Sequence, residues 1–145
     1  MGPVTGCYGG MRIGGTVRTR LLGALAALVS AAVHLYLWFD GVKDQGVVGA
    51  LFVVNVVAGV SIAVMLMRWR HWAPLFLLVG FGATTLGAFA IAATAGLFGI
   101  HTGWSWYAWL AAAAEVLAVL CGVYAAHQEG YLRQLRVRRV GSSQT

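Results

Sequence analysis

Charged residues are scarce in this chain. Lys and Arg together number 10 and Asp and Glu only 4 among 145 residues, so charged side chains make up 10% of the total. A soluble domain of ordinary composition carries about 25%. Hydrophobic residues reach 60%. The two values together exclude a soluble globule and predict an integral membrane protein.

The motifs of the common enzyme classes are also missing. The chain contains no G-x-S-x-G, no H-E-x-x-H and no glycine-rich phosphate loop between a strand and a helix. Its two cysteines, Cys7 and Cys121, form neither a C-x-x-C motif nor a Cys/His group with zinc spacing. No catalytic residue can be assigned, and a non-enzymatic protein is favoured.

What the chain does have is four long apolar runs. They cover about 21–39, 46–67, 74–98 and 104–126. Each is close to the roughly 20 apolar residues that a membrane-spanning helix needs. Because the three connections are short, consecutive helices are expected to be antiparallel neighbours. The predicted fold is all-α, an integral membrane antiparallel four-helix bundle over 21–126.

Basic segments flank the predicted bundle. Residues 1–20 are Gly-rich and basic with no apolar period, which predicts a flexible cytoplasmic tail. Residues 127–145 interleave Tyr131, Leu132 and Leu135 with arginines. That pattern predicts a basic cytoplasmic tail that partly forms an interfacial helix on an anionic leaflet.

Nine of the ten basic residues fall on the same side of the four runs, and only Lys43 lies on the other side. Cytoplasmic loops carry the Lys/Arg excess, so both termini are predicted to be cytoplasmic, in the inner (plasma) membrane. The same rule accounts for the net charge of +6, and no nucleic acid partner is predicted. Both cysteines would then lie in the reducing half, where no disulfide is expected. The nine are Arg12, Arg18, Arg20, Arg68, Arg70, Arg133, Arg136, Arg138 and Arg139, of which Arg68, Arg70, Arg133, Arg136, Arg138 and Arg139 are expected to bind lipid headgroups.

Small residues recur at every fourth position in the predicted spans. Membrane helices pack through such stripes, because lipid gives them no hydrophobic drive to associate. We therefore expect these stripes to face neighbouring helices. The third span carries Gly80, Thr84, Ala88, Ala92 and Gly96, and the fourth carries Ala114, Ala118, Gly122 and Ala126.

Glu115 is the most unusual residue, because it lies near the middle of the fourth span. A carboxylate facing lipid there would cost several kcal/mol, so we expect Glu115 to face the bundle interior. Other polar residues lie at similar depth, and His34 is predicted to reach Glu115. A His–Glu pair is compatible with a proton relay, half of a metal site or a structural bridge. The predicted buried polar layer, which we expect to be hydrogen-bonded, is Ser30, His34, Asn55, Thr84 and Glu115.

Haem and copper are the two cofactors that the histidines could hold. His34 and His101 are predicted at the outer side, and His71 and His127 at the inner side. Bundle haem ligands project from facing helices, whereas three of these four lie in loops or at helix ends. A copper site formed by His34, Asp40 and His101 at the outer mouth lacks a nearby methionine ligand. No cofactor is predicted, with haem and copper left as alternatives.

Four short segments carry a resemblance to known sequences. They are HLYLW at 34–38, GVKD at 41–44, GALF at 49–52 and GLFG at 96–99. Over roughly 20–125 the chain resembles small four-span membrane proteins of actinobacteria, which are generally uncharacterised. It is also similar in topology to DoxX-like proteins. The resemblance implies the four-span fold and an actinobacterial source, and it transfers no catalytic residue.

Two functions are consistent with these patterns. The small size and minimal loops favour a non-enzymatic accessory or scaffolding subunit of a larger envelope or respiratory complex. Its expected partners are the lipid bilayer and other membrane protein subunits, or a second copy of itself. The alternative is a redox, metal (copper or haem) or proton-handling membrane protein that uses His34 and Glu115.

Overall fold

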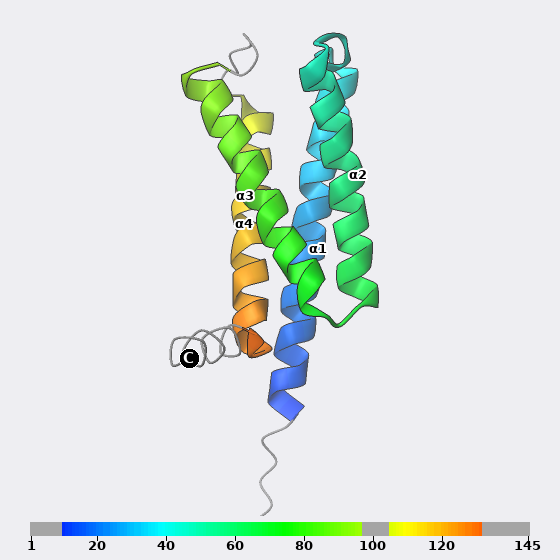
Figure 1. Cartoon of the computed structure of the whole chain (residues 1–145), viewed down its shortest axis with the longest axis vertical. Helices are drawn as coiled ribbons and strands as arrows, with labels where there is room; N and C mark the ends of the chain where they lie inside the picture. The colour runs from blue at the N-terminus through cyan, green and yellow to red at the C-terminus, as the bar shows by residue number, and fades with distance from the viewer. Residues whose placement is uncertain (1–9, 97–104, 132–145) are drawn as a thin grey trace, which may run out of the picture.

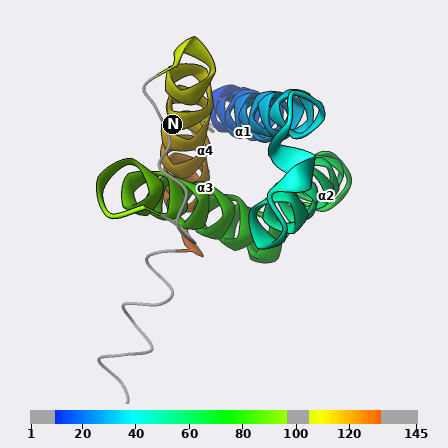
Figure 2. The ribbon, with the colours of Figure 1, turned by 90° about the horizontal axis from the view of Figure 1, so that it is seen from above.

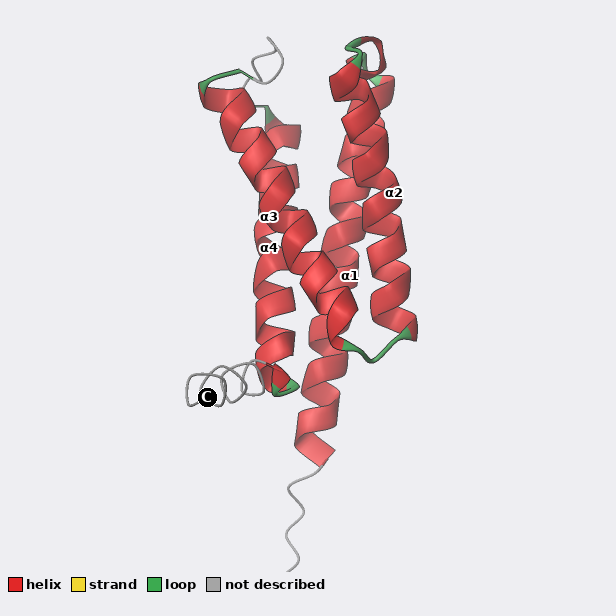
Figure 3. Cartoon of the chain, in the orientation of Figure 1, coloured by secondary structure: helices red, strands yellow, loops and turns green. Residues whose placement is uncertain are grey.

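The computed structural model describes residues 10–96 and 105–131, with side chains from residue 15 onward. Within these residues the chain is helical and contains no strand (Figures 1 and 3). All four α-helices are long and apolar enough to cross a bilayer. This confirms the predicted all-helical class and a multi-pass membrane protein. The elements are α1 (Gly10–Phe39), η1 (Val42–Asp44), α2 (Val47–Arg68), α3 (Trp72–Thr94) and α4 (Trp106–Gln128).

The helices do not contact one another equally. Helix α1 packs closely along both α2 and α4, and α3 packs closely along α4, whereas α2 and α3 have much less contact with each other. In Figure 1 the upper parts of α2 and α3 diverge, and Figure 2 shows the resulting open arrangement from above. The bundle is therefore tight on three sides and loose between α2 and α3.

The first helix begins earlier than the sequence predicted. Residues 1–20 were expected to be a flexible tail, but α1 already begins at Gly10. Thr19 and Arg20 are buried and bonded: the Thr19 hydroxyl donates to the Gly15 carbonyl, and the Arg20 guanidinium binds two other elements. A membrane helix can continue beyond its apolar run where its polar side chains have hydrogen-bond partners, as Thr19 and Arg20 do here. The apolar pattern of the sequence does not reveal those partners.

The third helix ends earlier than predicted. Its expected end was near Phe98, but the helix ends at Thr94 and Gly96 follows with a φ of 80°. This left-handed conformation suits glycine and is typical of the residue just beyond a helix. The fourth helix begins at Trp106, where the Ser105 hydroxyl accepts a hydrogen bond from the backbone N–H of Ala108 at 3.2 Å.

Glycines set the closest approaches between helices. A Cβ at Gly82 would lie 2.7 Å from the carbonyl oxygen of Glu115, and one at Gly122 would lie 3.2 Å from that of Leu75. Real Cβ atoms do not come as close as the first of these distances. Helices α3 and α4 can therefore pack at this distance only because both positions are glycine.

Part of the predicted stripe on the third span does not face a neighbouring helix, although its Ala92 is buried. A Cβ at Gly80 would meet no atom within 4 Å, and Thr84 is exposed. Helix α3 instead buries the face that contains Leu75, Leu78 and Gly82. Spacing identifies which residues share a face, but it does not tell which face meets the neighbouring helix. On α4, by contrast, the predicted Ala114, Ala118 and Gly122 are buried.

Candidate functional site

Ser30, His34 and Glu115 form a buried polar cluster where α1 packs on α4. Their exposed fractions are 0%, 8% and 1%. The Ser30 hydroxyl donates to Oε1 of Glu115 at 3.2 Å. One turn along α1, Nδ1 of His34 lies 2.8 Å from the Ser30 carbonyl oxygen and 3.5 Å from its hydroxyl. Ser30 thus connects the imidazole to the carboxyl group.

The contact with the Ser30 carbonyl shows which imidazole nitrogen of His34 carries a proton. A carbonyl oxygen can only accept, so Nδ1 of His34 must donate to it and carries a proton. In neutral histidine the other nitrogen, Nε2, is then an acceptor. No ion pair joins His34 to Glu115 among the described side chains, whose one salt bridge is Arg20–Glu129. Among the described residues, hydrogen bonds connect the two side chains through Ser30.

Asn55 forms a separate polar contact between α2 and α3. Its Nδ2 donates to the hydroxyl of Thr85 at 3.1 Å, and that hydroxyl donates to the Phe81 carbonyl at 2.8 Å. The residue predicted for the polar layer on this helix was Thr84, not Thr85. Thr84 is exposed and its hydroxyl lies within hydrogen-bonding distance of two carbonyls of its own helix, those of Gly80 and Phe81.

The predicted five-residue layer is therefore not one network. Ser30, His34 and Glu115 form one group, Asn55 pairs instead with Thr85, and Thr84 belongs to neither group. Adjacent residues on a helix point about 100° apart. The choice between two neighbouring threonines consequently depends on how α3 is rotated, which the sequence alone does not reveal. The sequence does show two adjacent threonines, Thr84 and Thr85, and either could have been considered as the partner of Asn55.

A groove opens between α2 and α3 and has a volume of about 500 Å³. His34 lies at its inner wall and its ring packs on Phe52, with centroids 4.8 Å apart. The polar lining comes from four side chains. One of their atoms, Oδ1 of Asn55, is buried and has no hydrogen-bond partner among the described residues. The lining residues are His34, Val48, Leu51, Phe52, Val54, Asn55, Ala58, Ile62, Leu77, Phe81, Thr84, Thr85 and Ala88.

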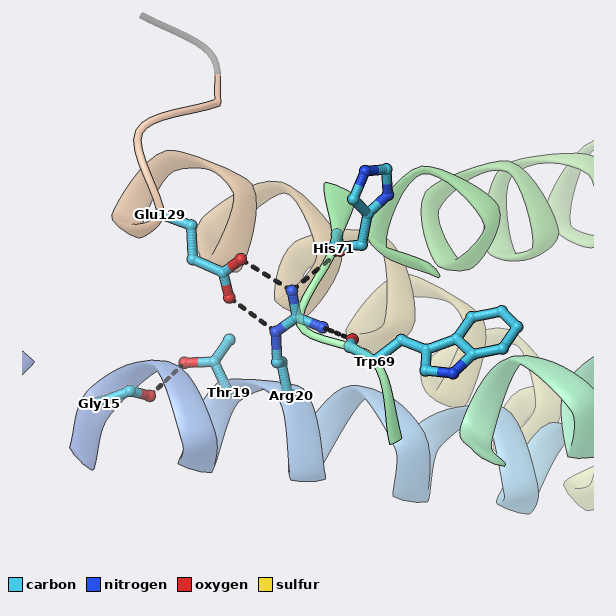
Figure 4. A network of polar contacts seen from close by, with 6 residues as sticks. All are labelled: Gly15, Thr19, Arg20, Trp69, His71 and Glu129. Carbon is cyan, nitrogen blue, oxygen red and sulfur yellow. Dashed lines mark hydrogen bonds and ion pairs between the residues drawn. The ribbon is translucent and has the colours of Figure 1, made fainter. Parts of the chain in front are cut away.

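Arg20 joins three elements at one end of the bundle (Figure 4). Its guanidinium forms a two-point contact with the Glu129 carboxylate, at 2.6 and 2.7 Å. It also donates to the backbone oxygens of Trp69 and His71 at 3.0 Å each. The side chains of Arg20 and Glu129 are only 7% and 17% exposed. Arg20 therefore holds α1, the α2–α3 connection and the end of α4 together.

The charge pattern predicts Arg20 only as one of nine arginines on the same side, and it does not single out Glu129. The available signal was that both residues lie at the same predicted end of the bundle. Arg68 and Arg70 are exposed at that end, and their contact with headgroups stays a prediction. The other four arginines of that set, Arg133, Arg136, Arg138 and Arg139, lie outside the described residues.

The predicted metal ligands are not brought together in the part of the chain that is described. His34 is buried, Asp40 is exposed, and His101 lies outside the described residues. Within residues 10–96 and 105–131, no three His, Cys, Asp or Glu side chains are placed to hold a metal ion. His71 has another role, because its Nδ1 accepts from the Ala73 N–H at the start of α3.

Comparison with known proteins finds no matching family model, no matching curated protein and no matching solved structure.

Proposed function

We propose that this protein is a non-enzymatic accessory or scaffolding subunit of a larger envelope or respiratory complex, and that it docks a partner's transmembrane helix on α3. The observation that carries the proposal is the outward face of α3. Gly80, Ala83, Gly87 and Ala90 share this face, and the last three are exposed. No atom lies within 4 Å of where a Cβ at Gly80 or Gly87 would be.

The other three helices present a different surface to the bilayer. Their exposed residues include large side chains along most of their length, such as Leu25, Val57 and Leu120. On α3 the exposed large hydrophobic residues are confined to the ends: Trp72, Phe76 and Leu77 near the start and Ile91 near the finish. Small residues in membrane helices let another helix approach closely. The middle of α3 is therefore suited to a helix rather than to lipid chains.

We further propose that both termini lie in the cytoplasm. Arg20 contacts the backbone of Trp69 and His71, which puts the start of α1 and the α2–α3 connection at one end. Arg68 and Arg70 belong to that same end. The excess of arginine there supports a cytoplasmic assignment.

Photo-crosslinking tests the docking proposal. With benzoylphenylalanine at position 83, purification in a gentle detergent should yield an adduct with one partner subunit. The same group at position 57, on the lipid face of α2, should yield none. Replacing Gly80 and Gly87 with Leu should lower recovery of that partner by about tenfold or more, whereas Val57→Leu should not change it. Adducts only to lipid, or only to a second copy of this chain, would refute the accessory-subunit proposal.

Proton handling is a second candidate, and the observation that favours it is the Ser30 bridge between His34 and Glu115. Glu115→Gln keeps an acceptor for the Ser30 hydroxyl but cannot release a proton at neutral pH. If the cluster is only structural, this variant should fold with unchanged thermal stability and support the partner complex fully. A complex that assembles with Glu115→Gln but loses proton-coupled activity would instead support proton handling.

A further inference from the structure

We propose that the groove between α2 and α3 binds a membrane-dissolved molecule that carries a hydroxyl group on an apolar body, either an alcohol or a phenol. The hydroxyl would donate to Oδ1 of Asn55 or to Nε2 of His34. This proposal is independent of the docking face on α3, because the groove is lined by a different side of that helix, which includes Leu77, Phe81 and Ala88.

The Asn55 amide is the first reason to expect a donor. Its Nδ2 donates a hydrogen bond to the Thr85 hydroxyl, while Oδ1 is buried with no partner in the described part of the chain. The Thr85 proton is already donated to the Phe81 carbonyl, so Thr85 cannot also donate to Asn55. Buried polar atoms in proteins are almost always paired. The orphaned Oδ1 belongs to a side chain that lines the groove, but the atom itself is buried, so a ligand would reach it only after the surrounding side chains move.

His34 supplies a second acceptor in the same groove. Its Nδ1 is held by the Ser30 carbonyl oxygen at 2.8 Å, and the neutral ring therefore presents a lone pair at Nε2. No described residue donates to this nitrogen. Oδ1 of Asn55 and Nε2 of His34 are both acceptors, so a ligand that donates a proton can pair with either of them. A ketone, an ester or an ether brings no proton and would leave both of these atoms unpaired.

The walls of the groove determine the rest of the ligand. They are built mainly from aliphatic and aromatic side chains, including Phe52, Ile62 and Phe81. Leu51, Val54 and Leu77 line the groove and are also exposed, at 44%, 61% and 41%. On the outer face of a membrane-spanning bundle, exposure means contact with lipid, so the entrance is lateral. The ligand must therefore arrive from the hydrocarbon.

The size of the groove favours a small molecule over a partner helix. A helix with its side chains is about 10 Å wide, so a few turns could not lie fully inside 500 Å³. That volume lies within the roughly 300–1,000 Å³ of small-molecule sites. A lipid acyl chain would fit, but it has no donor and would leave both acceptors unpaired.

A matched pair of probes tests this assignment. The probes are an alkylphenol with a diazirine in its chain and the methyl ether of the same compound. The full chain in lipid nanodiscs should be labelled about tenfold more by the phenol than by the ether, since one hydrogen bond is worth about that factor. The adducts should map to Phe52, Ala58 or Phe81. Asn55→Leu should remove most of the difference, whereas Val57→Leu on the lipid face should retain it.

Equal labelling of the wild-type protein by the two probes would refute the proposal, because it would show that the groove holds only apolar chains. This comparison uses no variant, so it stands even if Asn55→Leu fails to fold. Phenol labelling that persists at full strength in a folded Asn55→Leu protein would exclude Asn55 as the acceptor. A further variant, Asn55→Leu with His34→Phe, must then lower the labelling about tenfold, or the assignment is wrong.

Discussion

Replacing Arg20 with Met is expected to lower the free energy of unfolding by about 3–5 kcal/mol, the usual cost of removing one member of a buried ion pair. The substitution keeps an unbranched apolar stem but removes the guanidinium. The Glu129 carboxylate and the backbone carbonyls of Trp69 and His71 would then all lose their hydrogen-bond donor. The Glu129 side chain is only 17% exposed, so its unpaired charge would stay largely buried. The measurement is reversible unfolding in mixed micelles by titration with SDS.

Arg18→Met is the matched control for this prediction. Arg18 lies two residues earlier on the same helix and is exposed, so its loss should change stability by less than about 0.5 kcal/mol. Adding Glu129→Leu to Arg20→Met should recover part of the lost stability, because the unpaired carboxylate is then gone. If Arg18→Met and Arg20→Met proved equally stable, the three-element contact in Figure 4 would not stabilise the bundle.

Replacing Gly82 with Ala is expected to destabilise the protein by about 1–3 kcal/mol, the usual cost of overpacking. The new Cβ would lie 2.7 Å from the Glu115 carbonyl oxygen and 2.8 Å from Cγ2 of Val119. The first of these atoms belongs to the backbone of α4 and cannot move without shifting the helix. The shift would also strain the nearby hydrogen bond between Ser30 and Glu115.

Gly87→Ala provides the same substitution on the same helix without the contact. A Cβ at Gly87 meets no atom within 4 Å, and alanine is a better helix former than glycine by up to about 1 kcal/mol. This variant should be unchanged or more stable in the SDS titration. If both substitutions had the same effect, the close approach of α3 to α4 at Gly82 would be incorrect.

These two predictions concern the tight side of the molecule, and the proposed ligand groove lies on the loose side. Arg20 and Gly82 hold α1, α3 and α4 together. Between α2 and α3 the contacts are sparse and a groove remains, and within the described ranges the Asn55 Oδ1 has no hydrogen-bond partner. Closer packing of α2 against α3 would bury more side-chain surface and add contacts between the helices. An open groove at this side is consistent with the proposed ligand occupying it.

The sequence by itself determined the class of the protein and its four membrane-crossing helices, because long apolar runs with few charges permit no other solution in a bilayer. It also identified Ser30, His34 and Glu115 as buried polar residues at one depth, since a charged or polar group in a span must avoid lipid. Both inferences follow from the free energy of transferring single residues. Neither depends on how the helices are rotated.

Only the tertiary structure decided what the rotation of each helix brings together. In the structure Asn55 pairs with Thr85 rather than Thr84, and Gly82 rather than Gly80 is buried against α4. Arg20, which the sequence shows as one of several basic residues, contacts three elements. Each outcome depends on an angle about a helix axis, and neighbouring residues differ in that angle by about 100°. Small residues are compatible with both a packed and an exposed face. The periodicity of a sequence therefore defines the faces, and only packing selects among them.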